Sequence, residues 1–167
     1  MNRRIRSIAP FACGLLLAAC STVQGPASVP TAIRAGQSWV VTRPMVAAQV
    51  LDTCSRPSPG HDAGRVTGYW APSRQQVEQL EAQLGQLEGR VSSPQDSDRQ
   101  YVGIEADGRE LIYVNAFTLA DGSDIDPARE AIRVCDGGAT FWGAVFDPRS
   151  ATFSELQVDG PPPAPER

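Results

Sequence analysis

Residues 101–117 read YVGIEADGRELIYVNAF and predict the centre of a β-sheet. Two runs rich in β-branched and aromatic residues, 101–105 and 111–117, flank the dipeptide Asp107-Gly108. An aspartate followed by a glycine is typical of a two-residue hairpin, because that turn requires positive φ angles. We therefore expect two antiparallel strands, and we expect the second and longer run to be a central strand.

Three further segments toward the C-terminus have strand character: 131–135, 140–146 and 151–158. The last segment alternates apolar and polar residues, as a strand with one solvated face does. The proline-rich end, 160–167, cannot continue a hydrogen-bonded ladder and is expected to be a disordered tail. Together with the hairpin, these segments predict an antiparallel meander of about five strands.

Two helices are expected before the hairpin. Apolar residues recur at helical spacing between 77 and 87, and Ser73 with Gln76 forms a capping-box pattern. We therefore predict one long helix over 73–89. A shorter helix is expected to start at Pro44, where proline fits the first turn, and to run toward residue 54. Packed on one face of the sheet, the two helices would give an α+β domain.

The N-terminus determines where the protein is expected to act. Residues 1–19 have a basic start and an apolar middle, which is the layout of a secretory signal. The segment Leu17-Ala18-Ala19-Cys20 resembles the lipobox of bacterial lipoproteins. This resemblance implies cleavage before Cys20, acylation of Cys20, and, with Ser21 following, an outer-membrane anchor on the periplasmic face. An uncleaved anchor is the alternative, but the apolar run is shorter than the roughly 20 residues that a spanning helix needs.

The rest of the chain divides into three parts. Residues 20–37 are rich in Ser, Thr, Pro, Gly and Ala and are expected to form a flexible tether. Residues 38–159 have the size of a single domain. The tail 160–167 completes the chain.

The charge of the chain limits its partners. All 15 basic residues are arginines, against 19 acidic residues. Without the three arginines of the signal, twelve would remain and the net charge would be about −7. An acidic domain is not attracted to nucleic acid or to anionic lipid head groups, but it favours a basic protein partner. The alternative interpretation is that the charge only keeps the domain soluble.

The cysteines predict one disulfide bond. Cys13 would be lost with the signal and Cys20 would carry lipid, so Cys54 and Cys135 remain. Because the periplasm is oxidising, we expect these two to be bonded. The alternative is a reactive thiol with His61 as its base. His61 is the only histidine and lies in a Pro/Gly-rich loop where no neighbouring residue would orient it.

The acidic loop 121–126 has a superficial likeness to a calcium-binding loop. It carries Asp121, Asp124 and Asp126, but Ile125 and Asp126 take the fifth and sixth places, where an EF-hand has an oxygen donor and a glycine. We therefore interpret the loop as a solvated acidic turn and expect no metal and no cofactor.

Candidate binding residues are those of loops between rigid elements, because such loops often carry function. We select His61, Trp70, Asp121, Asp124 and Asp126 on this basis. The alternative for each is an ordinary loop or core position.

Three blocks of the sequence resemble a group of small proteobacterial envelope lipoproteins. They are Cys-Ser-Arg at 54–56, Gly-Tyr-Trp-Ala-Pro-Ser at 68–73, and Cys-Asp-Gly-Gly followed by Phe-Trp-Gly within 135–143. The likeness extends over roughly residues 45–159. It implies an envelope location and one compact domain, and it implies no activity.

The chain lacks the common catalytic signatures, among them the nucleophile elbow, the zinc-binding His-Glu-x-x-His, the P-loop and the dinucleotide fingerprint. We therefore expect a non-catalytic, lipid-anchored periplasmic binding protein. One form is an inhibitor or immunity protein against a cell-wall-degrading toxin. The alternatives are a structural or assembly accessory of the outer membrane and, less favoured, a carboxylate-based hydrolase.

Overall fold

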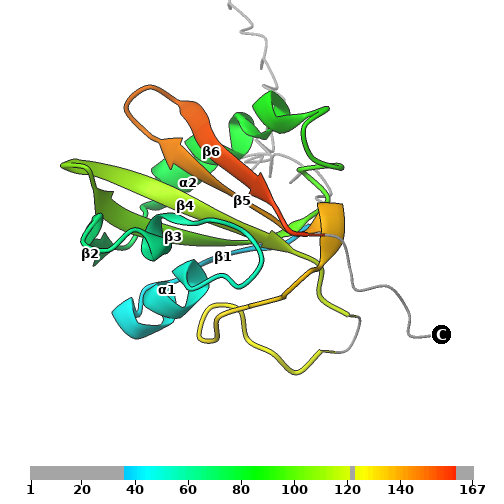
Figure 1. Cartoon of the computed structure of the whole chain (residues 1–167). Helices are drawn as coiled ribbons and strands as arrows, with labels where there is room; N and C mark the ends of the chain where they lie inside the picture. Colours follow the sequence, from blue (N-terminus) through cyan, green and yellow to red (C-terminus); the bar gives the residue numbers. More distant parts are fainter. Residues whose placement is uncertain (1–35, 121–122, 161–167) are drawn as a thin grey trace, which may run out of the picture. The chain divides into compact units, whose positions relative to one another are not determined.

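The computed structural model describes residues 36–120 and 123–160, and all the elements named below belong to this part (Figure 1). Its centre is a six-stranded sheet, and short helices lie on both sides of it. The strands are β1 Ser38–Val40, β2 Val66–Trp70, β3 Asp98–Ala106, β4 Arg109–Phe117, β5 Trp142–Asp147 and β6 Thr152–Val158. The helices are α1 Pro44–Leu51 and α2 Arg74–Ala82, with 3-10 turns η1 Pro59–His61, η2 Leu84–Leu87 and η3 Gly138–Thr140.

The predicted hairpin is confirmed. Strands β3 and β4 pair antiparallel along their whole lengths, and β4 also pairs with β5, so β4 is a central strand. The turn residues Asp107 and Gly108 have φ angles of 52° and 71°. These positive angles are those that a two-residue hairpin requires.

The sheet is not the pure antiparallel meander that we expected. Its order is β1-β3-β4-β5-β6, and β2 pairs with β3 as well. β1 and β2 share one edge of β3: β1 runs parallel along Arg99–Tyr101, and β2 runs antiparallel along Gly103–Ala106. The strand β2 is not among the predicted strands, since its pairing depends on a partner more than 30 residues away.

The prediction of a strand at 131–135 is wrong. This segment is irregular, because its backbone bonds to side chains instead of a neighbouring strand. The Ile132 amide donates to Gln100 Oε1 at 3.1 Å, and the Ile132 carbonyl accepts from Asn115 Nδ2 at 2.9 Å. Cys135, at its end, forms the predicted disulfide with Cys54, and the two Cα atoms are 5.4 Å apart.

The long helix is shorter than predicted. The capping box of Ser73 and Gln76 is present, but α2 ends at Ala82 and continues only as the 3-10 turn η2. Gly85 lies in η2, and glycine costs an α-helix interior roughly 1 kcal/mol relative to alanine. The tighter turn still buries both leucines of η2 in the core. The helix α1 starts at Pro44 as predicted and ends at Leu51.

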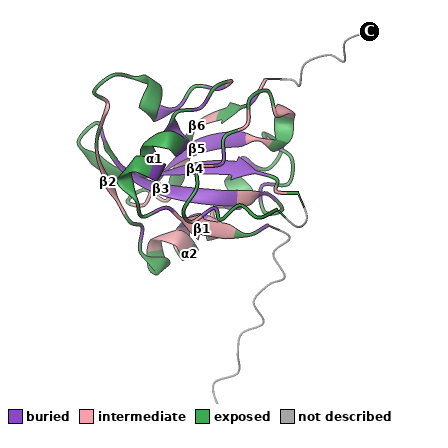
Figure 2. Cartoon of the chain, turned by 90° about the horizontal axis from the view of Figure 1, so that it is seen from below, coloured by how far each residue is buried: buried purple, intermediate pink, exposed green. Residues whose placement is uncertain are grey.

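The two helices lie on opposite faces of the sheet, so the prediction that both cover one face is wrong. Along β4, Leu111 and Tyr113 pack with α1, whereas Ile112 and Val114 pack with α2 and η2. Figure 2 shows buried residues along β3, β4 and β5. A strand that is apolar on both faces needs cover on both, which is why one helix layer is not enough.

A buried polar network fastens the irregular segments to the sheet. The Arg56 guanidinium donates to Asp159 and to Asn115, and all three residues are buried. Asn115 in turn donates to Gln100 Oε1 at 3.1 Å, and Gln100 donates to the Pro127 carbonyl at 2.6 Å. The network therefore connects the segment after α1, strands β3 and β4, the 123–135 segment and the end of β6.

Candidate functional site

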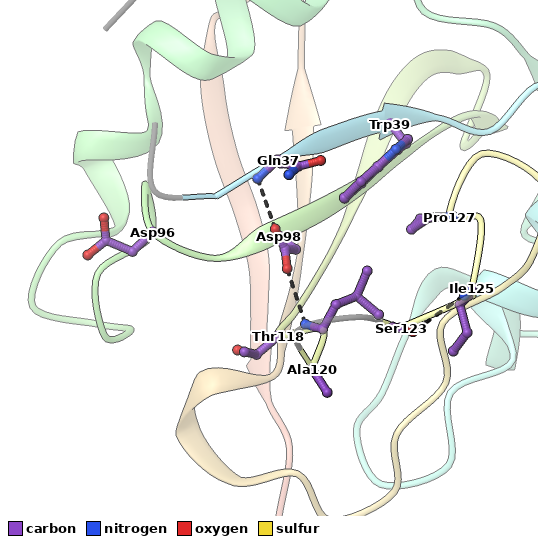
Figure 3. Close-up of a pocket in the computed structure, with 10 residues that line it drawn as sticks. Gln37, Trp39, Asp96, Asp98, Thr118, Ala120, Ser123, Ile125 and Pro127 are labelled. Atoms are coloured by element: carbon purple, nitrogen blue, oxygen red, sulfur yellow. Dashed lines mark hydrogen bonds between the residues drawn. The ribbon is translucent and has the colours of Figure 1, made fainter. Parts of the chain in front are cut away.

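An open cleft of about 440 Å³ lies at one end of the sheet in the described part of the chain. It forms where β1 and β3 begin and β4 ends (Figure 3). We call it the Trp39 cleft. Its lining residues are Gln37, Trp39, Asp96, Asp98, Thr118, Leu119, Ala120, Ser123, Ile125 and Pro127.

The parallel pairing of β1 with β3 places Trp39 at the cleft. Trp39 lies opposite Gln100 in the register, and its indole stacks on the ring of Phe117 in β4. The ring centroids are 6.1 Å apart and the planes are inclined by 21°. Phe117 is buried and Trp39 is half-buried. The indole is therefore held by an aromatic neighbour while part of it lines the cleft.

Asp98 holds two sides of the cleft together. Its Oδ1 accepts from the Gln37 amide at 2.9 Å, and its Oδ2 accepts from the Leu119 amide at 3.1 Å (Figure 3). The carboxylate thus connects the start of β1 with the segment after β4. A carboxylate has about four lone-pair sites, so two remain for a ligand after these bonds.

The turn before β3, which carries Asp96, is fixed by a buried arginine. Arg99 donates to the carbonyls of Pro94 and Gln95 at 3.1 Å each. It also donates to the Tyr101 hydroxyl at 2.9 Å, and burial raises the pKa of Tyr101. The phenol therefore stays neutral and donates to Glu81 at 2.7 Å. These bonds fix the turn that carries Asp96 and so stabilise one wall of the cleft.

The chain enters the domain at the same wall. Gly36 is buried, and a Cβ at this position would collide with the Ser97 carbonyl. The Gln37 carbonyl accepts from the Arg99 amide at 2.8 Å. The sequence placed Gly36 and Gln37 in the tether, but Gly36 is buried against Ser97 and Gln37 is hydrogen-bonded to β3. Residues 1–35, including Cys20, lie outside the described residues.

The cleft is acidic. Two of its ten described lining residues are aspartates, and none of these ten is basic. Leu119, Ile125 and Pro127 supply an apolar part of the wall. The combination of carboxylates, an aromatic ring and aliphatic groups fits a ligand that is positively charged at one end and apolar along its length.

His61 lies elsewhere. It is exposed in η1 and lines a separate cavity of about 120 Å³ with Arg65 and Glu155. Its Nε2 is 3.4 Å from Thr53 Oγ1. Cys54 is bonded to Cys135, so the alternative of a free thiol activated by His61 does not hold in this structure.

Trp70 is at the end of β2 and is partly a core residue. Its Nε1 donates to the Ile104 carbonyl at 3.1 Å, and its ring packs with the apolar residues beneath α2. The ring also lies over Gly103, where a Cβ would be 2.7 Å from Trp70 Cδ2. Trp70 therefore does not line the Trp39 cleft.

The acidic loop lies beside the cleft, but Asp124 and Asp126 do not line it. Ser123 and Ile125 are lining residues, whereas Asp124 is exposed. Asp126 accepts from the Ala128 amide at 3.0 Å and pairs with Arg129 at 3.5 Å, so its carboxylate caps a turn. Asp121 lies outside the described residues.

Sequence reasoning missed the residues that form the cleft, namely Trp39, Asp96 and Asp98. Trp39 is nearly 60 positions away from the two aspartates, and only the pairing of β1 with β3 brings them together. The available signal was a tryptophan at the start of the ordered domain, followed much later by two aspartates before a strand. This pattern does not indicate that the tryptophan and the aspartates lie close together in the fold.

Within residues 36–120 and 123–160 there is no group of three or more His, Cys, Asp or Glu side chains that could hold a metal ion. Nor does any helix in the same ranges have the length and apolar character to cross a membrane. Comparison with protein families, with curated proteins and with solved structures finds no match for this chain.

Proposed function

We propose that this chain is a non-catalytic, lipid-anchored periplasmic binding protein that holds a basic protein partner in the Trp39 cleft. Immunity against a cell-wall-degrading toxin is one concrete form of this role. The anchor rests on the lipobox-like segment ending at Cys20. The partner's chemistry rests on the cleft.

The single observation that carries the proposal is the lining of the cleft: among the described residues it contains Asp96 and Asp98 and no basic side chain. Elsewhere the chain compensates many of its carboxylates internally, as Arg65 does for Asp107 and Glu155. A concave acidic surface attracts a cationic partner and accelerates its association.

The roles of the other charged groups support a binding function over catalysis. Buried Arg56 and Arg99 bond to carboxylates and carbonyls that hold loops in place, and Glu81 bonds to Tyr101. These groups serve the fold. Each carboxylate oxygen of Asp98 accepts a hydrogen bond from a backbone amide, so Asp98 has a structural role as well.

The anchor is tested by replacing the predicted lipid site. In cells, Cys20→Ser should move the protein from the membrane fraction to the soluble periplasmic fraction. Cys13→Ser is the matched control, since Cys13 lies within the predicted signal and should have no effect on the fraction. Retention of the Cys20→Ser protein in the membrane would contradict the anchor.

The partner is tested by capture. Full-length protein immobilised at low ionic strength should retain a stoichiometric basic protein from an envelope extract, and raising the salt should weaken retention by slowing association. Asp96→Asn should weaken it, whereas Asp124→Asn, an exposed aspartate outside the cleft lining, should not. Recovery of no stoichiometric partner at low salt would remove the proposal.

A further inference from the structure

We propose that the Trp39 cleft binds an arginine side chain of the partner, stacked on the indole with its guanidinium toward Asp98. The proposal rests on the proposed function in one respect, that the ligand is a basic protein. The inference goes beyond the proposed function by naming the recognised group, a guanidinium, and the side chains that bind this group.

The indole supplies a surface for a planar cation. Trp39 contacts Phe117 and also lines the cleft, whereas Phe117 is not a lining residue. Stacking on Phe117 fixes the orientation of the indole before a ligand arrives. A guanidinium is planar and weakly hydrated, so it stacks on an aromatic face more readily than an ammonium does.

Asp98 supplies a preorganised acceptor. Its two oxygens are held by the amides of Gln37 and Leu119, which come from opposite sides of the cleft. In the close-up, Asp98 lies between Asp96 and Trp39 (Figure 3). The fork of a guanidinium matches the spacing of two carboxylate oxygens, and such charge-assisted bonds are stronger than neutral ones.

The apolar part of the wall suits the stem of the same side chain. Leu119, Ile125 and Pro127 line the cleft and offer contacts for methylene groups. The cleft volume of about 440 Å³ falls in the range of ligand pockets, roughly 300–1,000 Å³. It therefore has room for the side chain together with part of the backbone that presents it.

Other ligand classes fit this lining less well. Among the described lining residues, an anion would meet two aspartates and no basic side chain. A neutral sugar would use the indole and the polar side chains but would gain nothing from the negative charge. A sugar is therefore the sharpest competing ligand for the test.

The experiment is a nuclear magnetic resonance titration of the full chain in detergent micelles with N-acetyl-arginine methylamide. Arginine should shift the indole N–H signal of Trp39 and the amide signal of Leu119. The uncharged citrulline analogue, which has nearly the same shape, should bind roughly tenfold more weakly, the change expected for about 1.4 kcal/mol of charge interaction. Equal binding of citrulline, or tighter binding of N-acetylglucosamine at the same signals, would overturn the inference.

Variants of the lining residues show where arginine binds. Trp39→Leu should remove most of the arginine response, and Asp96→Asn should weaken it by a smaller factor. Asp124→Asn is the matched control and should bind arginine as the wild type does. The proton–nitrogen spectrum of each variant verifies the fold. An unchanged arginine affinity in a folded Trp39→Leu protein would also refute the site.

The outcomes separate this inference from the proposed function. Arginine binding at the cleft without any captured partner would remove the proposed function and leave the site. A captured basic partner whose binding is unaffected by free arginine and by Trp39→Leu would keep the proposed function and remove this inference.

Discussion

Replacing Arg56 with methionine should destabilise the domain more than any change to a surface ion pair. Arg56 is 5% exposed, and the side chain of Asp159 is fully buried. Burial alone would lower the pKa of Arg56, but Tyr113 and Asp159 together raise it, so the guanidinium is charged. Methionine keeps much of the volume and removes the charge. Asp159 and Asn115 would then lose their shared donor.

The magnitude follows from this burial. Removing one partner of a buried ion pair typically costs about 3–5 kcal/mol, because the other charge is left uncompensated. For a domain of this size, 1 kcal/mol corresponds to roughly 4 °C in Tm. We therefore expect Arg56→Met to lower the Tm by roughly 12–20 °C.

The assay is thermal unfolding of the oxidised protein, followed by circular dichroism and tryptophan fluorescence. The matched control is Arg74→Met, because Arg74 also pairs with a carboxylate, Glu78, but its side chain is 92% exposed. Exposed pairs contribute little to stability, so this variant should melt as the wild type does.

A second variant tests the physical reason. If the cost arises from an uncompensated charge, Asp159→Asn added to Arg56→Met should recover part of the lost stability. The reasoning is refuted if Arg56→Met loses no more stability than Arg74→Met, or if the added Asp159→Asn lowers the stability further by its full single-variant cost.

Three further predictions concern the disulfide, the tyrosines and one glycine. The double variant Cys54→Ala/Cys135→Ala should lose about 4–5 kcal/mol of unfolding free energy, since the bond closes a loop with a sequence separation of 81 residues; an unchanged urea midpoint would contradict this. Burial raises the pKa of both Tyr101 and Tyr113, so above the ordinary value of about 10 the unfolded chain releases protons that the folded chain keeps. Stability should therefore fall as the pH rises past about 10, and the fall should be smaller in Tyr113→Phe; a urea midpoint independent of pH in this range would refute it. Gly143→Ala should cost about 1–3 kcal/mol in urea unfolding, because the new Cβ would meet the Tyr113 hydroxyl and lie 2.9 Å from Arg56 Nε; wild-type stability would show that the network can shift.

Local features were predictable from the sequence because each depends on a few neighbouring residues. The turn at Asp107-Gly108 follows from the positive φ that two adjacent positions need. The capping box of Ser73 and Gln76 requires only one helical turn. The strand 111–117 is apolar enough to be recognised as central. The disulfide was predicted by counting the cysteines that would remain after signal removal, on the expectation of an oxidising compartment.

Features that depend on distant partners were decided by the tertiary structure alone. The 131–135 segment has strand-like composition, yet its backbone groups are satisfied by Gln100 and Asn115, which no local pattern reveals. The cleft exists because β1 joins the sheet beside β3 and brings Trp39 to Asp98. The sequence specifies the chemical groups at Trp39 and Asp98. Their proximity results from long-range strand pairing, whose register is set by packing over the whole sheet.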